Sequence, residues 1–104
     1  MKLNLRERIA ILEILPAKNS IVTWRVINSL KELLGVTEDE HKEFNIVING
    51  DTITWNEKGL IEKELPIGQK AAEIIKTALV ALNNANKLEE VHISIYEKFV
   101  ESND

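Results

Sequence analysis

Apolar residues three or four positions apart run through residues 5–15, so they share one face of a helix. Asn4 comes directly before this stretch, and Glu7 stands three positions later, which is the spacing of a capping box. Pro16 disfavours helical geometry in the residue before it. The pattern predicts a helix over residues 5–15, with an apolar face broad enough for burial on more than one side.

The same spacing predicts a second helix that Ser20 or Thr23 caps and that ends at Gly35, which is placed for a left-handed C-terminal cap. A short acidic helix follows, opened by a second capping box at Thr37. Residues 69–83 carry an alanine-rich apolar stripe. This stripe predicts a long helix that can pack closely against its neighbours.

A last helix is predicted over residues 89–100. Val91, Ile93 and Ile95 alternate with polar residues, which also fits a strand. Glutamates and a lysine at the ends of this segment are good helix formers. They favour the helix over the strand.

Between the helical segments, residues 44–67 have the pattern of β-structure. Asn49-Gly50 is the strongest short-range signal for a two-residue hairpin turn, because both residues tolerate the positive φ of a type I′ turn. With these two residues in the loop, Ile46 lies opposite Ile53. Alternation of side chains then gives one apolar face made by Phe44, Ile46, Ile48, Ile53 and Trp55.

We expect helices to cover this face, because so small a sheet is not stable alone. Trp55 should be mostly buried against the helix over residues 69–83, whose alanines leave room for an indole. A third strand is expected over residues 61–67, at an edge of the sheet, because Pro66 cannot donate a ladder hydrogen bond. The predicted class is α+β, with about five helices and a small antiparallel sheet of two or three strands in a single domain, 1–104.

The composition is that of an ordinary globular protein, with 44% hydrophobic and 29% charged residues. The chain has no cysteine, which excludes disulfides, thiolate metal sites and thiol nucleophiles. The first residues do not have a signal-peptide pattern, and no apolar run reaches the ~20 residues of a membrane-spanning helix. We therefore expect a soluble, cytoplasmic protein without a membrane partner.

The net charge of −4 is unevenly distributed. Residues 1–36 hold six basic and three acidic side chains, and the remainder holds seven basic and fourteen acidic ones. Solvated helix faces explain this asymmetry more simply than a polar partner surface does. The candidate partner contacts in the basic third are Arg6, Arg8, Trp24, Arg25 and Lys31, and a core or helix-start position is the alternative for Trp24.

The sequence offers no catalytic constellation. A histidine-based triad would need a serine nucleophile, and no G-x-S-x-G elbow is present to supply one. The four glycines are isolated in sequence and form no phosphate-binding motif. His41 lies in a run of carboxylates that could hold a divalent cation, but a solvated helix face is the simpler interpretation. His92 falls on the apolar side of the last helix, where we expect a hydrogen-bonded, half-buried ring. We expect no enzyme activity, no metal and no cofactor.

Three helices followed by a hairpin is the element order of a winged-helix domain, so a DNA-binding transcriptional regulator is the alternative function. Its third helix would enter the major groove. Here that helix carries the four carboxylates Glu38, Asp39, Glu40 and Glu43. Because these would face DNA phosphates, nucleic acid is not the partner we expect.

Three stretches carry a resemblance: N-L-R-E-R-I-A-I-L-E-I-L-P near the start, I-T-W-N in the hairpin, and K-L-E-E-V-H-I-S-I-Y-E-K-F near the end. Through them the chain resembles, over nearly its whole length, a family of small proteins without assigned activity that phages and prophages of Gram-positive bacteria encode. The motifs are mostly capping and core residues, so they imply no catalytic residue. The resemblance implies a phage origin and action in the cytoplasm of an infected cell. We expect a non-enzymatic accessory protein that acts by protein–protein contact, alone or as a homo-oligomer.

Overall fold

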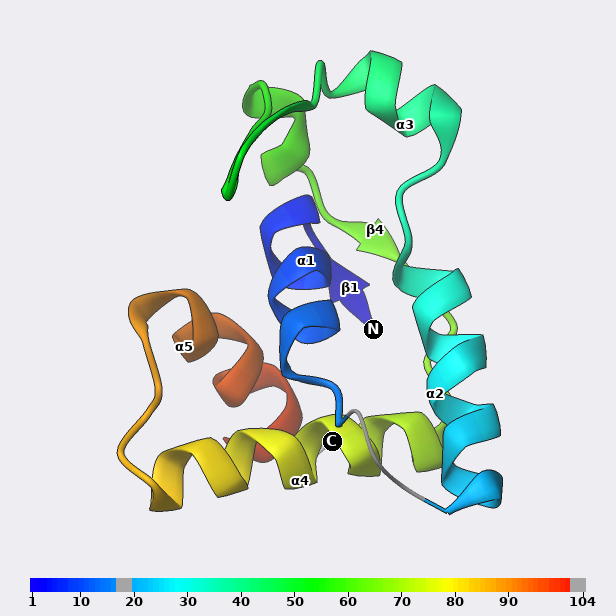
Figure 1. Cartoon of the computed structure of the whole chain (residues 1–104), viewed down its shortest axis with the longest axis vertical. Coiled ribbons are helices and arrows are strands. Elements are labelled where there is room, and N and C mark those ends of the chain that lie inside the picture. The colour runs from blue at the N-terminus through cyan, green and yellow to red at the C-terminus, as the bar shows by residue number, and fades with distance from the viewer. Residues whose placement is uncertain (17–19, 102–104) are drawn as a thin grey trace.

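The computed structural model describes residues 1–16 and 20–101. These residues form five α-helices and two antiparallel two-stranded sheets, an α+β fold (Figure 1). The α-helices are α1 (Leu5–Ile14), α2 (Ile21–Leu34), α3 (Glu38–Glu43), α4 (Gln69–Asn84) and α5 (Glu90–Tyr96). The remaining elements are β1 (Lys2–Leu3), β2 (Val47–Asn49), β3 (Thr52–Thr54), the 3₁₀ turn η1 (Glu57–Leu60), β4 (Lys63–Glu64) and the π-helical turn η2 (Glu97–Glu101).

The helix-start signals in the sequence are confirmed. The Glu7 N–H donates to Asn4 Oδ1 at 2.9 Å, and Glu7 Oε1 accepts from the Asn4 N–H at 3.0 Å, which completes the first capping box. Thr37 and Glu40 make the same reciprocal pair at the start of α3. Ser20, rather than Thr23, is the N-cap of α2. The last segment is helical, as predicted.

Gly35 ends α2, but the predicted left-handed cap is wrong. Its φ of −60° and ψ of 153° are extended. Its N–H donates to the Lys31 carbonyl at 2.9 Å. A Cβ at this position would stand 3.0 Å from the same oxygen. Glycine is therefore favoured here by a close approach to backbone and not by a positive φ.

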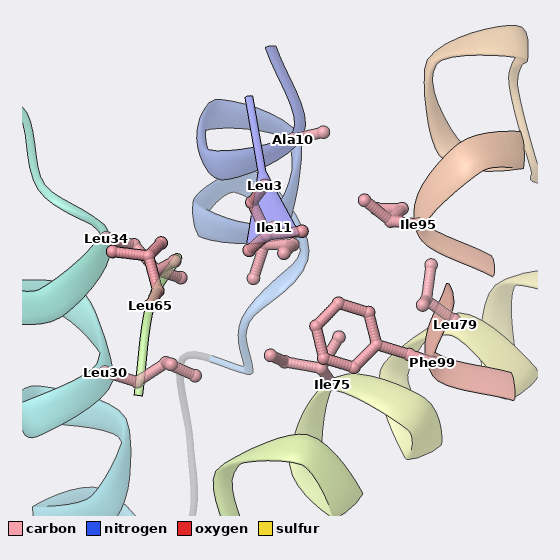
Figure 2. Packing of buried hydrophobic residues seen from close by; sticks show 10 residues of the cluster. All are labelled: Leu3, Ala10, Ile11, Leu30, Leu34, Leu65, Ile75, Leu79, Ile95 and Phe99. Atoms are coloured by element: carbon pink, nitrogen blue, oxygen red, sulfur yellow. The ribbon is translucent and has the colours of Figure 1, made fainter. Parts of the chain in front are cut away.

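The core forms where the first helix meets the others. α1 packs against α5, α2 and α4, and in Figure 1 α4 crosses below α1. The Lys98 ammonium in η2 donates to the Lys2 carbonyl at 2.9 Å and to Glu7 Oε1 at 2.8 Å, and it also pairs with Glu62, so it ties the end of the described chain to its beginning. Figure 2 shows the buried apolar side chains Leu3, Ala10, Ile11, Leu30, Leu34, Leu65, Ile75, Leu79, Ile95 and Phe99.

The expected third strand does not join the hairpin. β4 pairs instead with β1, a strand of two residues that the sequence analysis did not predict, with Lys2 opposite Glu64 and Leu3 opposite Lys63. This small sheet places Leu3 and Leu65 in the core, at 0% and 3% exposed. Burial of both leucines gives the pairing its physical reason.

β2 and β3 form the predicted hairpin in a different register. Ile48, not Ile46, lies opposite Ile53, and the two loop residues are Gly50 and Asp51. Only Gly50 of the pair has a positive φ, +65°, so glycine occupies the first central position, as in a type II′ turn. The partner of Ile53 is thus two residues later in β2 than predicted. Because side chains alternate with a period of two, the same residues still share one face of the hairpin.

Trp55 does not lie against α4, and the prediction that helices cover the hairpin is also wrong. In Figure 1 the hairpin, in green, lies at the upper left, on the other side of α3 from α2, and α4 runs along the bottom of the view. The Trp55 indole packs on Gly59, where an added Cβ would come within 2.4 Å of the ring. Toward the core, α4 presents Ile75 and Leu79, both 0% exposed. These side chains pack in the core with residues from α1 and α5.

Candidate interaction surface

Arg8, one of the predicted partner contacts, is inside the protein at 2% exposed. Its Nη1 and Nη2 donate to the two carboxylate oxygens of Glu40 at 2.7 and 3.1 Å. Its Nε donates to the Leu34 carbonyl at 3.1 Å, and Nη2 also donates to the Gly35 carbonyl at 2.7 Å. Arg8 therefore joins α1 to the end of α2 and to α3, and it is not a surface contact.

This ion pair also sets the charge state of Glu40, the one buried residue of α3. The hydrogen bond from Arg8 lowers the pKa of Glu40 from 4.5 to about 2, although desolvation raises it. The Thr37 N–H and the positive charges of Arg8 and Lys63 lower it further. Glu40 is therefore ionised in the folded protein throughout the neutral range.

Acid should weaken the fold through Glu40. Because its folded pKa lies below the unfolded one, the stabilisation is complete above pH 4.5 and is lost as the pH falls toward 2. We expect about 3 kcal/mol of the free energy of unfolding to disappear between about pH 5 and pH 2 from this group. Urea unfolding across that range measures it. The Arg8→Met/Glu40→Leu double variant is the control, and an equally steep loss in that variant would assign the effect to other carboxylates.

The remaining candidate contacts lie at the surface in two places. Lys31 Nζ sits 4.9 Å from the centroid of the half-buried Trp24 ring, a cation–π contact on α2. Arg25 is exposed on the same helix, and Arg6 is exposed on α1. The structure thus brings Trp24 and Lys31 together, and it removes Arg8 from the basic surface altogether.

The two histidines have different environments. His92 is 8% exposed, and its Nδ1 accepts the Glu89 N–H at 2.9 Å, so the expected hydrogen-bonded ring is confirmed and is more deeply buried than predicted. His41 is exposed on α3. Over residues 1–16 and 20–101, no three His, Asp or Glu side chains gather closely enough to hold a metal ion.

α3 lacks the surface of a DNA-reading helix. It is six residues long, and one of its carboxylates, Glu40, turns inward to Arg8. The carboxylates it exposes are Glu38, Asp39 and Glu43. These charges repel phosphates along the exposed length of the helix.

The purified protein should not bind duplex DNA with a Kd tighter than about 1 μM at about 150 mM salt. Contacts to six phosphates need six cations on one face. Burial of Arg8 reduces the predicted set to Arg6, Arg25 and Lys31. Fluorescence anisotropy with labelled duplexes over a salt series measures this. Tighter binding with a steep salt dependence would instead favour the winged-helix regulator.

Large apolar side chains are exposed in and just after the hairpin, where the sequence pattern predicted a covered face. Five large ones, between 37% and 70% exposed, fall in one short stretch that contains the hairpin and η1. We call them the hairpin patch: Val47, Ile48, Ile53, Leu60 and Ile61. Ile48 and Ile53 had been predicted as buried positions. Of the five, Ile48 and Ile53 lie opposite each other and share one uncovered face of the hairpin, which marks a candidate interaction site.

The hairpin also leaves strand edges open. β2 and β3 pair only with each other in the described structure, so each has one edge without a strand partner. Natural edges are usually protected by charged residues or proline. Residues 46–55 contain no lysine, arginine or proline, and Asp51 is their one charged residue. This lack of edge protection is the sequence signal that could have identified the surface.

No helix within residues 1–16 and 20–101 is both long enough and apolar enough to cross a membrane. No protein-family model, curated protein or solved structure matches the chain. The hairpin patch is therefore interpreted from its own chemistry.

Proposed function

We propose that the protein is a non-enzymatic binding module that contacts a protein partner through the hairpin patch. The observation that carries this proposal is the exposure of Ile48 and Ile53, at 64% and 37%, on a hairpin with open edges. Full burial of an isoleucine side chain contributes about 1.5–3 kcal/mol. Burial of several side chains of the hairpin patch would therefore supply a large driving force for association.

The geometry favours recognition by strand addition. An extended partner segment can pair with an open edge of β2 or β3, and its main chain then supplies hydrogen bonds. Ile48 and Ile53 project from one face of the hairpin and Val47 from the other. A partner that fits has a free strand edge flanked by apolar pockets. The partner needs no particular charge, because Asp51 at the tip is the one charged residue in residues 46–55.

The resemblance to phage and prophage proteins supports an accessory role in an infected Gram-positive cell, with the cytoplasm as the compartment. An accessory protein of this kind acts by occupying a surface on another protein. The hairpin patch supplies such a contact without any catalytic group.

Site-specific photo-crosslinking inside bacterial cells tests the proposal. A photo-reactive phenylalanine analogue at position 48 or 53 should give a discrete crosslinked product, which excess untagged protein competes away. Asn28, an exposed polar residue on α2, is the control position. Equal products from positions 28 and 48, or none from 48 and 53, would contradict the assignment.

A matched substitution separates binding from folding. Ile48→Ser should remove the crosslink formed from position 53 and change the free energy of unfolding by less than about 0.5 kcal/mol, because Ile48 is 64% exposed. Chemical denaturation measures the second quantity. A loss of several kcal/mol would mean that the residue belongs to the core instead.

A further inference from the structure

The backbone of the hairpin directs unpaired groups toward its two edges. Asn49 and Thr52 flank the two-residue loop. The hydrogen bond that closes such a turn joins these two residues, so they form a hydrogen-bonded pair. The next pair, Ile48 with Ile53, is then of the non-hydrogen-bonded kind, because the two kinds alternate along an antiparallel ladder. The N–H and C=O of Ile48 therefore point out from β2, and those of Ile53 point out from β3.

The β2 edge is the more open of the two. Ile48 is 64% exposed, whereas Ile53 is 37% exposed. Among the described residues, no backbone group outside the hairpin forms a hydrogen bond with Ile48. β2 contains no charged residue, whereas Asp51 directly precedes β3, and charged residues protect strand edges. The β2 edge is therefore the better place for another strand to pair.

The open part of the β2 edge is short, because α3 closes one end of it. The Ile46 N–H donates to the His41 carbonyl at 3.1 Å. Ile46 stands two residues before Ile48, so its N–H points to the same edge. The last turn of α3 thus occupies this edge at Ile46. A partner strand that fits must leave the edge opposite Ile46.

We propose that a second copy of this chain pairs with the β2 edge, β2 antiparallel to β2, about a two-fold axis through the Ile48 pair. The inference rests on the proposed function and names the partner of the hairpin patch. In this register Gly50 of the second copy lies opposite Ile46, so the second chain turns away where α3 closes the edge. The two-fold axis repeats this fit at the other end. A second copy therefore brings a strand of the length that the edge accepts.

The side chains also complement themselves in this register. A two-fold axis perpendicular to the sheet keeps equivalent faces on the same side, so Ile48 and Ile53 of both copies form one apolar row across four strands. Val47 lies opposite Asn49 of the second copy on the other face. Residues 46–49 carry no charge, so the pairing brings no like charges together. Two hairpins that are marginal alone become one four-stranded sheet with an apolar face.

Sedimentation velocity of the purified full chain over a concentration series tests the dimer. β2 has three residues, so its edge buries less than the roughly 1,200–2,000 Å² of a standard interface. We therefore expect a weak dimer that forms between about 10 μM and 1 mM. A wild type that is still monomeric at about 1 mM would overturn the proposal.

Opposite charges at position 48 test the register. Ile48→Lys and Ile48→Glu should each weaken self-association by at least about tenfold, because each places two like charges side by side at the axis. An equimolar mixture of the two variants should associate at least about tenfold more tightly than either alone, since residue 48 then faces the opposite charge. A mixture that stays monomeric would overturn the register. Wild-type association of either single variant would overturn the interface.

Two proline variants distinguish the two edges. Ile48→Pro and Ile53→Pro each remove an isoleucine and an outward N–H, and each leaves the ladder hydrogen bonds in place. Ile48→Pro should abolish the dimer, whereas Ile53→Pro should keep its Kd within about threefold of wild type. Circular dichroism checks that both variants retain their helices. The reverse outcome would assign the contact to β3 and overturn the proposal.

Crosslinking from positions 48 and 53 separates this inference from the proposed function. A product of twice the mass of the chain supports the second copy. A product of another mass, together with a monomeric wild type in sedimentation, would overturn the second copy and leave the binding module standing. Absence of any product would overturn the binding module and the second copy with it.

Discussion

Replacing Arg8 with methionine should lower the free energy of unfolding by about 3–5 kcal/mol at neutral pH. The change removes one partner of a buried ion pair and leaves the Glu40 carboxylate, 8% exposed, without its guanidinium. It also leaves the Leu34 and Gly35 carbonyls without the donors that join α1 to the end of α2. Urea denaturation followed by circular dichroism measures the loss.

The double variant Arg8→Met/Glu40→Leu is the matched control. It removes both charges together, so we expect most of the lost stability to return. The difference between single and double variants separates the cost of an unpaired charge from the cost of lost packing. A single variant within about 1 kcal/mol of wild type would mean that Glu40 finds solvent or Lys63 once Arg8 is gone.

Ile95→Ala should destabilise the fold by about 2–5 kcal/mol, whereas Ile93→Ala should change stability by less than about 1 kcal/mol. The two residues have the same chemistry and stand two positions apart in α5. Ile95 is 0% exposed and lies in the core, and Ile93 is 53% exposed. Thermal or chemical unfolding of both variants measures the contrast.

This pair of variants also tests the secondary structure. In a strand, Ile93 and Ile95 would share one face and their truncations would have similar effects. In a helix, positions two apart point in very different directions. Equal losses from the two variants would therefore contradict the helix of the structure.

The sequence predicted the helices well because their signals are local. A capping box needs only Asn4 and Glu7, and the stripe of α4 repeats over four turns. Each helix satisfies its own backbone hydrogen bonds, so its existence depends little on which neighbour it meets. The bounds of α1 and α4 accordingly agree with the prediction to within one residue.

The β-structure was predicted less well because its partners are distant in sequence. No local pattern pairs Lys63 with Leu3, 60 positions earlier. In the hairpin, Asn49-Gly50 and Gly50-Asp51 both suit a two-residue turn. The two turns give strand pairings that differ by two residues, and both pairings place the same side chains on one face, so the apolar pattern cannot distinguish them. The apolar face of Ile48 and Ile53 was taken as core, because its pattern does not distinguish a fold contact from a partner contact.

The candidate site was predicted only in part for the same reason. Arg8 looked like a surface cation because its partner, Glu40, lies 32 positions away. Trp24, Arg25 and Lys31 lie at or near the surface of α2, as a helix stripe predicts.

The packing of α1 against α5 has a consequence for synthesis on the ribosome. The apolar face of α1 is completed by Ile95 and Phe99, and Lys98 fastens the two segments. A nascent chain exposes Ile11 until this last part has left the exit tunnel. Because domains generally fold as units and long-range contacts form late, the core should close only after nearly all described residues have emerged. Until then the growing chain is a client for chaperones that bind apolar segments.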